Sequence, residues 1–158
     1  MRPDVSPGAV LERLLAFDSE LRLEAYYGER SVFYNPRGVA PLGVIFASVK
    51  ERDGPNDAAA RLSRPGVWRL AFGMSAEAFA ARFGGMPARP PKGRAVALPG
   101  WDLTRLDELT PHPVYAWMGW VQILSPSRAS FDHLQPLLAE SLDLARARWH
   151  HRGRHASH

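Results

Sequence analysis

The sequence contains no cysteine, only two lysines and no long hydrophobic run. The absence of cysteine excludes disulfide bonds and thiolate metal sites. No apolar segment approaches the ~20 residues that cross a bilayer as a helix, so we expect no membrane-spanning segment and no membrane partner. Asp4 and Glu12 fall where a signal peptide would be apolar, so the N-terminal stretch indicates a helix instead. These features are consistent with a cytoplasmic location.

The excess of positive charge lies at the C-terminal end. The chain has 20 basic and 16 acidic residues, which gives a formal net charge of +4. Residues 146–158 contain no acid and four arginines, namely Arg146, Arg148, Arg152 and Arg154. Without them the body is neutral, so the tail is the candidate for phosphate contacts with nucleic acid.

The length and the pattern of apolar residues predict one α+β domain. A chain of 158 residues, 46% of them hydrophobic, can bury a core without disulfides. We expect a single domain over residues 1–149 and a loose, basic, His- and Arg-rich tail over residues 150–158. Strands are expected at residues 22–27, 31–34, 42–50, 67–74 and 120–126.

The helices are expected mainly at the two ends of the chain. One runs from Pro7 to about Asp18, and a long amphipathic one follows residue 131, with a kink or late start at Pro136. A short helix at residues 76–83 and single helical turns at 57–62 and 102–109 complete the list. Short connections favour an antiparallel sheet of about five strands, with the N- and C-terminal helices packed on one face.

The segment PHPVYAWMGW gathers the most versatile side chains in the chain. His112 stands between two prolines, whose fixed φ angles stiffen the backbone. We expect Trp120, which begins a strand, to be structural. We expect His112, Tyr115 and Trp117 to line a ligand groove covered by the loop of residues 84–101. The alternative is a rigid, well-packed entry to a strand.

Arg69 is a charged residue in an otherwise apolar strand. A strand arginine must reach water or an anion, because an unpaired buried charge is costly. It either forms a salt bridge with Glu24 or Glu51 or binds a carboxylate or phosphate on a ligand. Arg69 is therefore the fourth candidate ligand-binding residue.

No motif in the sequence assigns a reaction, a metal or a cofactor. There is no nucleophile elbow and no phosphate loop. His112 and His133 are isolated, and the histidines of the tail lack the helical spacing and carboxylate of a hydrolytic zinc site. We therefore assign no catalytic residue, no metal ligand and no cofactor, and the oligomeric state stays open.

Three segments together resemble an uncharacterised bacterial family of domain-of-unknown-function type. They are SVFYNP, LSRPGVWRLAFGMSAEAFAARFG and PHPVYAWMGWVQILSPSRASFDHLQPLLAESLDLA, and the resemblance spans about residues 28–148. The chain departs from that pattern at YYGERS and IFASVKE. More distantly, the last strand and helix are similar to the YjbR/MmcQ group, whose CyaY-like fold implies an α+β sandwich with terminal helices on one face of the sheet.

Three functional hypotheses follow. The first is a non-enzymatic binding domain with a groove for a small molecule or peptide, formed by His112, Tyr115, Trp117 and Arg69. The second is nucleic-acid binding through the C-terminal arginines, against which the neutral body argues. The third is an enzyme that uses His112, against which the lack of recognisable catalytic partners argues.

Overall fold

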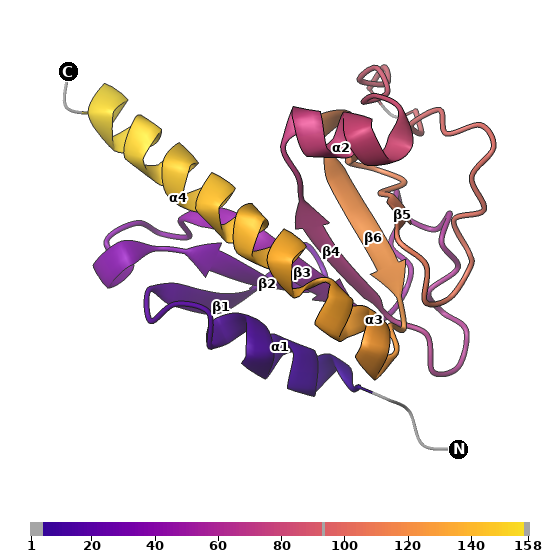
Figure 1. Ribbon diagram of the computed structural model, residues 1–158, viewed down its shortest axis with the longest axis horizontal. Helices are drawn as coiled ribbons and strands as arrows, with labels where there is room; N and C mark the ends of the chain where they lie inside the picture. The colour runs from indigo at the N-terminus through magenta and orange to yellow at the C-terminus, as the bar shows by residue number, and fades with distance from the viewer. Residues whose placement is uncertain (1–4, 93, 157–158) are drawn as a thin grey trace.

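The computed structural model describes residues 5–92 and 94–156, the last four by their backbone alone. It has an α+β architecture in which six strands form one antiparallel sheet (Figure 1). The strands are β1 (Leu21–Tyr26), β2 (Glu29–Tyr34), β3 (Val44–Lys50), β4 (Arg69–Gly73), β5 (Thr110–Pro111) and β6 (Trp120–Leu124). Their order in the sheet is β1-β2-β3-β4-β6-β5. The expected fold class is confirmed, and the short strand β5, which pairs with β6, raises the strand number to six.

The helices lie close to the positions that local sequence signals predict, but the first helix ends at Leu15, before the end expected near Asp18. They are α1 (Pro7–Leu15), α2 (Ala76–Phe83), α3 (Arg128–His133) and α4 (Gln135–Ala156), with single 3-10 turns η1 (Pro36–Gly38) and η2 (Ala116–Met118). The Ser6 hydroxyl accepts from the Ala9 amide at the start of α1, and Gly84 ends α2 with a φ of 90°. The C-terminal helical segment is divided at Leu134, so α4 starts late, next to Pro136.

The hydrophobic core lies between one face of the sheet and the terminal helices. Val32, Ala47, Phe72 and Val121 are aligned across β2, β3, β4 and β6, and all four are buried in this core. Neighbours in register project from the same face of an antiparallel sheet. Both α1 and α4 contact this side of the sheet, and α4 contributes the buried Leu138 among others. Burying each large aliphatic side chain stabilises the fold by roughly 1.5–3 kcal/mol.

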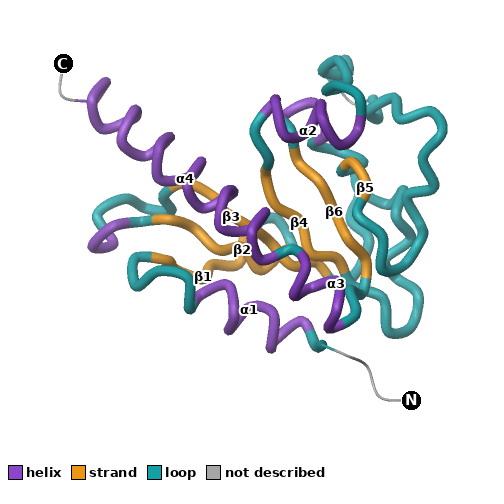
Figure 2. The backbone as a smooth tube through the Cα atoms, viewed as in Figure 1, coloured by secondary structure: helices purple, strands orange, loops and turns teal. Residues whose placement is uncertain are grey.

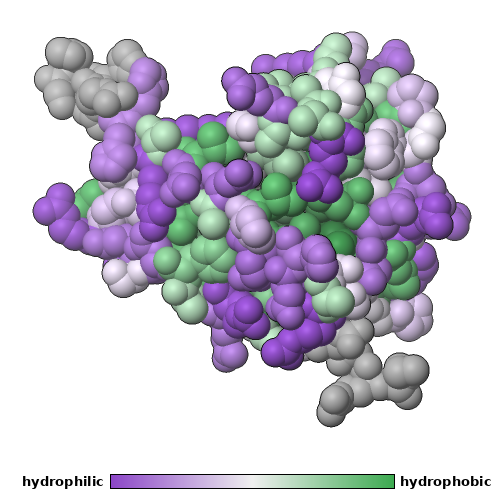
Figure 3. Space-filling model, viewed as in Figure 1, coloured by the Kyte–Doolittle hydropathy of each residue, from purple (hydrophilic) through white to green (hydrophobic). Residues whose placement is uncertain are grey.

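The outer surface of the helix layer is mostly hydrophilic. Figure 3 shows polar residues along α4, and hydrophobic side chains gathered between α4 and α2. A furrow there is lined by Met74, Ala78, Leu137 and Leu144, together with acidic and polar residues. Among the described helices, none is long and apolar enough to cross a membrane.

The opposite face of the sheet carries polar residues under long loops. Ser31, Ser48, Ala71 and Gln122 are in register across it. The connections between β3 and β4 and between α2 and β5 gather on the β5 side of the molecule (Figure 2). The structure forms turns instead of the helical turns expected at 57–62 and 102–109. The sheet therefore has a helix-covered face and a face that loops cover only in part.

Candidate functional site

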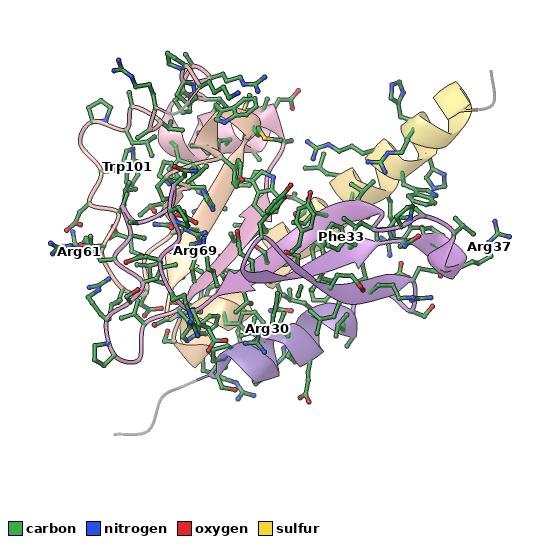
Figure 4. The ribbon with its side chains drawn as sticks, turned by 180° about the vertical axis from the view of Figure 1, so that it is seen from behind. Arg30, Phe33, Arg37, Arg61, Arg69 and Trp101 are labelled. Atoms are coloured by element: carbon green, nitrogen blue, oxygen red, sulfur yellow. The ribbon has the colours of Figure 1, made fainter. Side chains whose placement is uncertain are left out.

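A pocket of about 150 Å³ opens on the sheet face away from the helices. We call it the tyrosine pocket and define it by its lining residues: Tyr26, Tyr27, Glu29, Ser31, Ile45, Ser48, His112, Tyr115, Met118 and Trp120. Figure 4 views this face, with Phe33 over the β1 to β3 half of the sheet and Arg69 beneath the loops of the other half. Strands, a hairpin turn and the segment before β6 therefore meet at one site.

The floor of the tyrosine pocket comes from β2 and β3. Ser31 and Ser48 are paired across these strands, so their side chains share the loop-side face. The Ser48 hydroxyl donates to Glu29 Oε1 at 2.8 Å. Ser31 is buried, yet its hydroxyl makes no hydrogen bond within the described residues. The floor thus presents an oriented carboxylate and a hydroxyl with unused hydrogen-bonding capacity.

Tyr27 stands at the rim, on the two-residue turn between β1 and β2. Tyr27 and Gly28 have φ angles of 50° and 76°, which is left-handed backbone. Such turns favour Asn-Gly, and a left-handed conformation costs a residue with a side chain about 1–2 kcal/mol. Tyr27 is nevertheless 83% exposed, and its ring packs edge-on against that of Tyr26, with centroids 4.4 Å apart. The turn holds an exposed aromatic ring where local preference favours a small polar residue.

His112 is held by the backbone of its own segment. Its Nδ1 accepts hydrogen bonds from the amides of Val114 and Tyr115, at 3.0 and 3.1 Å. In the neutral ring the proton therefore resides on Nε2, so any hydrogen bond from His112 to a ligand is donated by Nε2. The ring centroid lies 5.1 Å from that of Tyr115 and 6.5 Å from that of Trp120. Pro111 precedes and Pro113 lies within a compact turn that buries the histidine, rather than a loop that exposes it.

Burial keeps His112 uncharged. Its side chain is 1% exposed, and burial lowers its pKa well below the usual value, with the positive charge of Arg69 acting in the same direction. The attraction of Asp57 opposes these two causes without cancelling them. At neutral pH, His112 is therefore a hydrogen-bond donor.

The depressed pKa of His112 predicts a loss of stability in mild acid. Below about pH 6.5 the unfolded chain protonates this histidine while the folded chain does not, so stability falls as pH decreases. The contribution is about 1.4 kcal/mol per pH unit until the folded pKa is reached. His112→Asn keeps an acceptor near Nδ1 and should remove this slope in urea unfolding at pH 7.0 and 5.5. The control His133→Asn, at an exposed histidine, should preserve the pH dependence of stability. An unaltered slope in His112→Asn would show that this pH dependence does not come from His112.

A buried ion cluster lies beside the tyrosine pocket, formed by Lys50, Asp57, Arg69 and Glu29. The guanidinium of fully buried Arg69 binds Asp57 through two hydrogen bonds, at 2.9 and 2.5 Å. Lys50 Nζ donates to Asp57 Oδ2 at 2.9 Å. Arg69 Nη2 lies 3.7 Å from Glu29 Oε1, which is the link between the cluster and the pocket.

The ion cluster corrects the partners expected for Arg69. Arg69 pairs with Asp57 and Glu29 rather than with Glu24 or Glu51, and Glu51 instead accepts from Arg30 at 2.6 Å. Because Arg69 is fully buried and already bound to carboxylates, it supports the site from below and does not line the tyrosine pocket.

The residues expected to form one groove, His112, Tyr115 and Trp117, do not all line the same cavity. Tyr115 lines the tyrosine pocket, and it also lines a second groove of about 740 Å³ together with Trp117. That second groove runs along the 84–101 loop, where the guanidinium of Arg89 stacks 4.5 Å from the centre of the Trp117 ring. His112 and Trp120 line only the first of these two cavities. The structure thus brings His112 and Tyr115 together in the tyrosine pocket, whereas Trp117 lines the second groove and not this pocket.

The C-terminal arginines lie on or near the end of α4. Arg146 is bound to Asp18 and Asp143, whereas Arg148 is exposed. Exposed Arg152 donates to the Gly43 carbonyl at 3.5 Å, and the side chain of Arg154 lies outside the described part of the chain. Helical backbone continues to Ala156, through most of the segment expected to be a loose tail. The division into a domain and a loose tail stays a prediction.

Several residues of the site were not singled out by the sequence. Glu29, Ser31 and Ser48 belong to strands whose burial does not alternate, so no periodic signal in the sequence marks these residues. The pairing of β2 with β3 is what places Ser31 and Ser48 on the loop-side face. Asp57 carries no periodic signal either, because it lies in a turn. In the described residues, no group of three or more His, Asp or Glu side chains could hold a metal ion.

Comparison with known proteins identifies the family and leaves the activity open. No curated protein and no solved structure matches the chain. The more distant resemblance to the YjbR/MmcQ group therefore stays a prediction. A family of unknown function, DUF6194, matches residues 5–154, which covers nearly the whole chain and includes every residue of the tyrosine pocket. The chain belongs to the DUF6194 family.

Proposed function

We propose that the protein is a binding domain that takes a small organic molecule, about the size of one planar ring, into the tyrosine pocket. The observation that carries this proposal is a set of polar groups between aromatic walls that have no hydrogen-bond partner among the residues that the structure describes. They belong to residues of β2 and of the segment 112–120, which are far apart in the sequence, so the fold itself brings them together. A cytoplasmic location is part of this proposal.

The unused hydrogen-bonding groups provide both donors and acceptors. Ser31 Oγ, Trp120 Nε1 and His112 Nε2 make no hydrogen bond to any described residue, although all three side chains are buried. The second carboxylate oxygen of Glu29 is likewise unpaired within the described chain. These four atoms are reached by solvent, since the fully buried side-chain atoms without a partner in the described residues are Arg69 Nε and Gln122 Oε1. Four polar groups open to one cavity favour a ligand with complementary atoms, which would replace water there.

The size and walls of the pocket favour a compact, flat ligand. In another protein an apolar cavity of about 150 Å³ binds benzene, so this volume suits a single ring. The rings of Tyr26, Tyr115 and Trp120 offer edges and faces against which such a ring can pack. Ile45 and Met118 add apolar contact. A peptide would need more space than this pocket alone provides.

The two other hypotheses rest on weaker arrangements. An enzyme that uses His112 as a base would need a free nitrogen lone pair, but Nδ1 already accepts two backbone hydrogen bonds. Nucleic-acid binding through the tail would compete with the ion pairs that Arg146 makes with Asp18 and Asp143. Both remain alternatives to be tested, without a cavity or residue cluster that favours them.

A ligand-observed NMR screen with single-ring probes such as phenol, indole and imidazole tests the proposal. We expect at least one probe to bind with a millimolar or lower Kd, and Tyr115→Ala to weaken it by about tenfold, because the change removes one wall. Trp117→Ala is the matched control, since Trp117 lies in the second groove and its loss should leave probe binding unchanged. Equal losses in both variants, or no binding by any probe, would overturn the proposal.

A further inference from the structure

We propose that the ligand of the tyrosine pocket is an organic ammonium ion, held by the Glu29 carboxylate and by the faces of the surrounding aromatic rings. This inference rests on the proposed function, because it assigns a charge to the ligand of the same pocket. Its test can be separated from the test with ring-sized probes. A neutral ring and a small alkylammonium ion would contact the same pocket walls, but only the ammonium ion is attracted by a carboxylate.

Among the described residues, Glu29 is the only charged one that lines the tyrosine pocket. Its side chain is 14% exposed, and Oε1 is fixed by the Ser48 hydroxyl at 2.8 Å and by Arg69 at 3.7 Å. Oε2 has no partner within the described chain. A carboxylate that is largely removed from water needs compensation, and a cation in the pocket supplies it at the unpaired oxygen.

The member of the ion cluster that lies at the pocket is negatively charged. Its four charges sum to zero, but Arg69 and Lys50 are both directed at Asp57, at 2.9 Å or less. Glu29 is more distant from Arg69 and is the member of the cluster that reaches the pocket. In accord with this, burial and the negative charge of Glu29 both raise the pKa of the Tyr115 phenol.

Aromatic side chains share the tyrosine pocket with this carboxylate. Tyr26, Tyr27, Tyr115 and Trp120 all line the pocket, and the Tyr26 and Tyr27 rings meet edge to face at the rim. The negative faces of tyrosine and tryptophan rings attract a cation, and sets of such rings recognise methylated ammonium groups. The left-handed backbone of Tyr27 keeps one ring exposed at the entrance, where a ligand would contact it.

The decisive comparison is between choline and its neutral isostere 3,3-dimethyl-1-butanol, titrated into the full chain by NMR or calorimetry. The two probes have nearly the same shape and differ by one positive charge. We expect choline to bind about tenfold or more tightly, the factor that corresponds to a cation–π and carboxylate contact of moderate strength. Glu29→Gln keeps an acceptor for Ser48, and it should remove most of this preference by lowering the affinity for choline much more than the affinity for dimethylbutanol.

Glu24→Gln is the matched control, because Glu24 is an exposed carboxylate on the adjacent strand β1 and does not line the pocket. Equal affinity for the two isosteres in the unmodified protein would overturn the ammonium inference, and that result needs no variant. So would equal losses of choline binding in Glu24→Gln and Glu29→Gln, which would reflect general surface charge. If a neutral ring binds and choline does not, only the ammonium inference is overturned. If none of the probes binds, the proposed function is overturned as well.

Discussion

Replacing Asp57 by alanine is expected to lower the free energy of unfolding by about 3–5 kcal/mol. The change leaves the cations of Arg69 and Lys50 buried without their shared anion, and an uncompensated buried charge has a cost of this size. Both side chains are almost completely removed from solvent, so water replaces the lost carboxylate only in part. Urea unfolding followed by circular dichroism at pH 7 measures the loss.

The pH dependence of stability provides a second test of Asp57. Burial by itself raises the pKa of this carboxyl, but the hydrogen bonds and charges of Arg69 and Lys50 lower it far more, well below its usual range. Above about pH 4 the folded and unfolded chains both carry the ionised form, and the stabilisation is complete. As pH falls below that value, the unfolded chain takes up a proton first and stability decreases. The Asp57→Ala variant should lack this part of its acid sensitivity.

Asp132→Ala is a suitable control for Asp57→Ala. Asp132 is an exposed carboxylate whose distance to Arg13 is 4.0 Å, so its removal should cost less than about 1 kcal/mol. If Asp57→Ala cost no more than Asp132→Ala, the ion cluster would contribute little to stability, and its role in orienting Glu29 would be unsupported.

Replacing Trp120 by alanine is expected to lower the free energy of unfolding by about 3–5 kcal/mol, the usual cost of truncating a buried tryptophan. Trp120 is 6% exposed, and its indole lies over Gly73 on the neighbouring strand, where a β-carbon would lie 3.0 Å from Nε1. The ring also forms a wall of the tyrosine pocket, so the variant should lose the binding of ring-sized probes as well. The structural role expected for Trp120 is thus joined to a place in the candidate site.

The control for Trp120→Ala is Trp101→Ala. Trp101 is partly exposed and packs against Phe83 at the side of α2, away from the tyrosine pocket. We expect a smaller loss of stability and no effect on probe binding. Unfolding by denaturant and NMR titration of the same samples measure both quantities. A Trp120→Ala protein as stable as the unmodified chain would show that the ring is held loosely at the surface.

The sequence by itself determined the helices, most of the strands and the face on which the terminal helices pack. Ser6 before Pro7, and Ser75 and Gly84 around α2, are capping signals that act within one turn of helix. The spacing of apolar residues in α4 acts over the length of that element, and Pro136 marks its start because proline suits the first turn of a helix. Such signals can be read from neighbouring residues alone.

Only the tertiary structure decided which polar groups share the candidate site. Asp57 meets Arg69 and Lys50 through a turn that no local pattern specifies, and Glu29 reaches them across the sheet. Tyr115 and Trp117 are two residues apart, yet only Tyr115 lines the tyrosine pocket, because the 3-10 turn η2 begins between them. The pairing of β4 with β6 likewise joins segments separated by a long connection. These contacts depend on the free energy of the whole packed chain, which local periodicity does not encode.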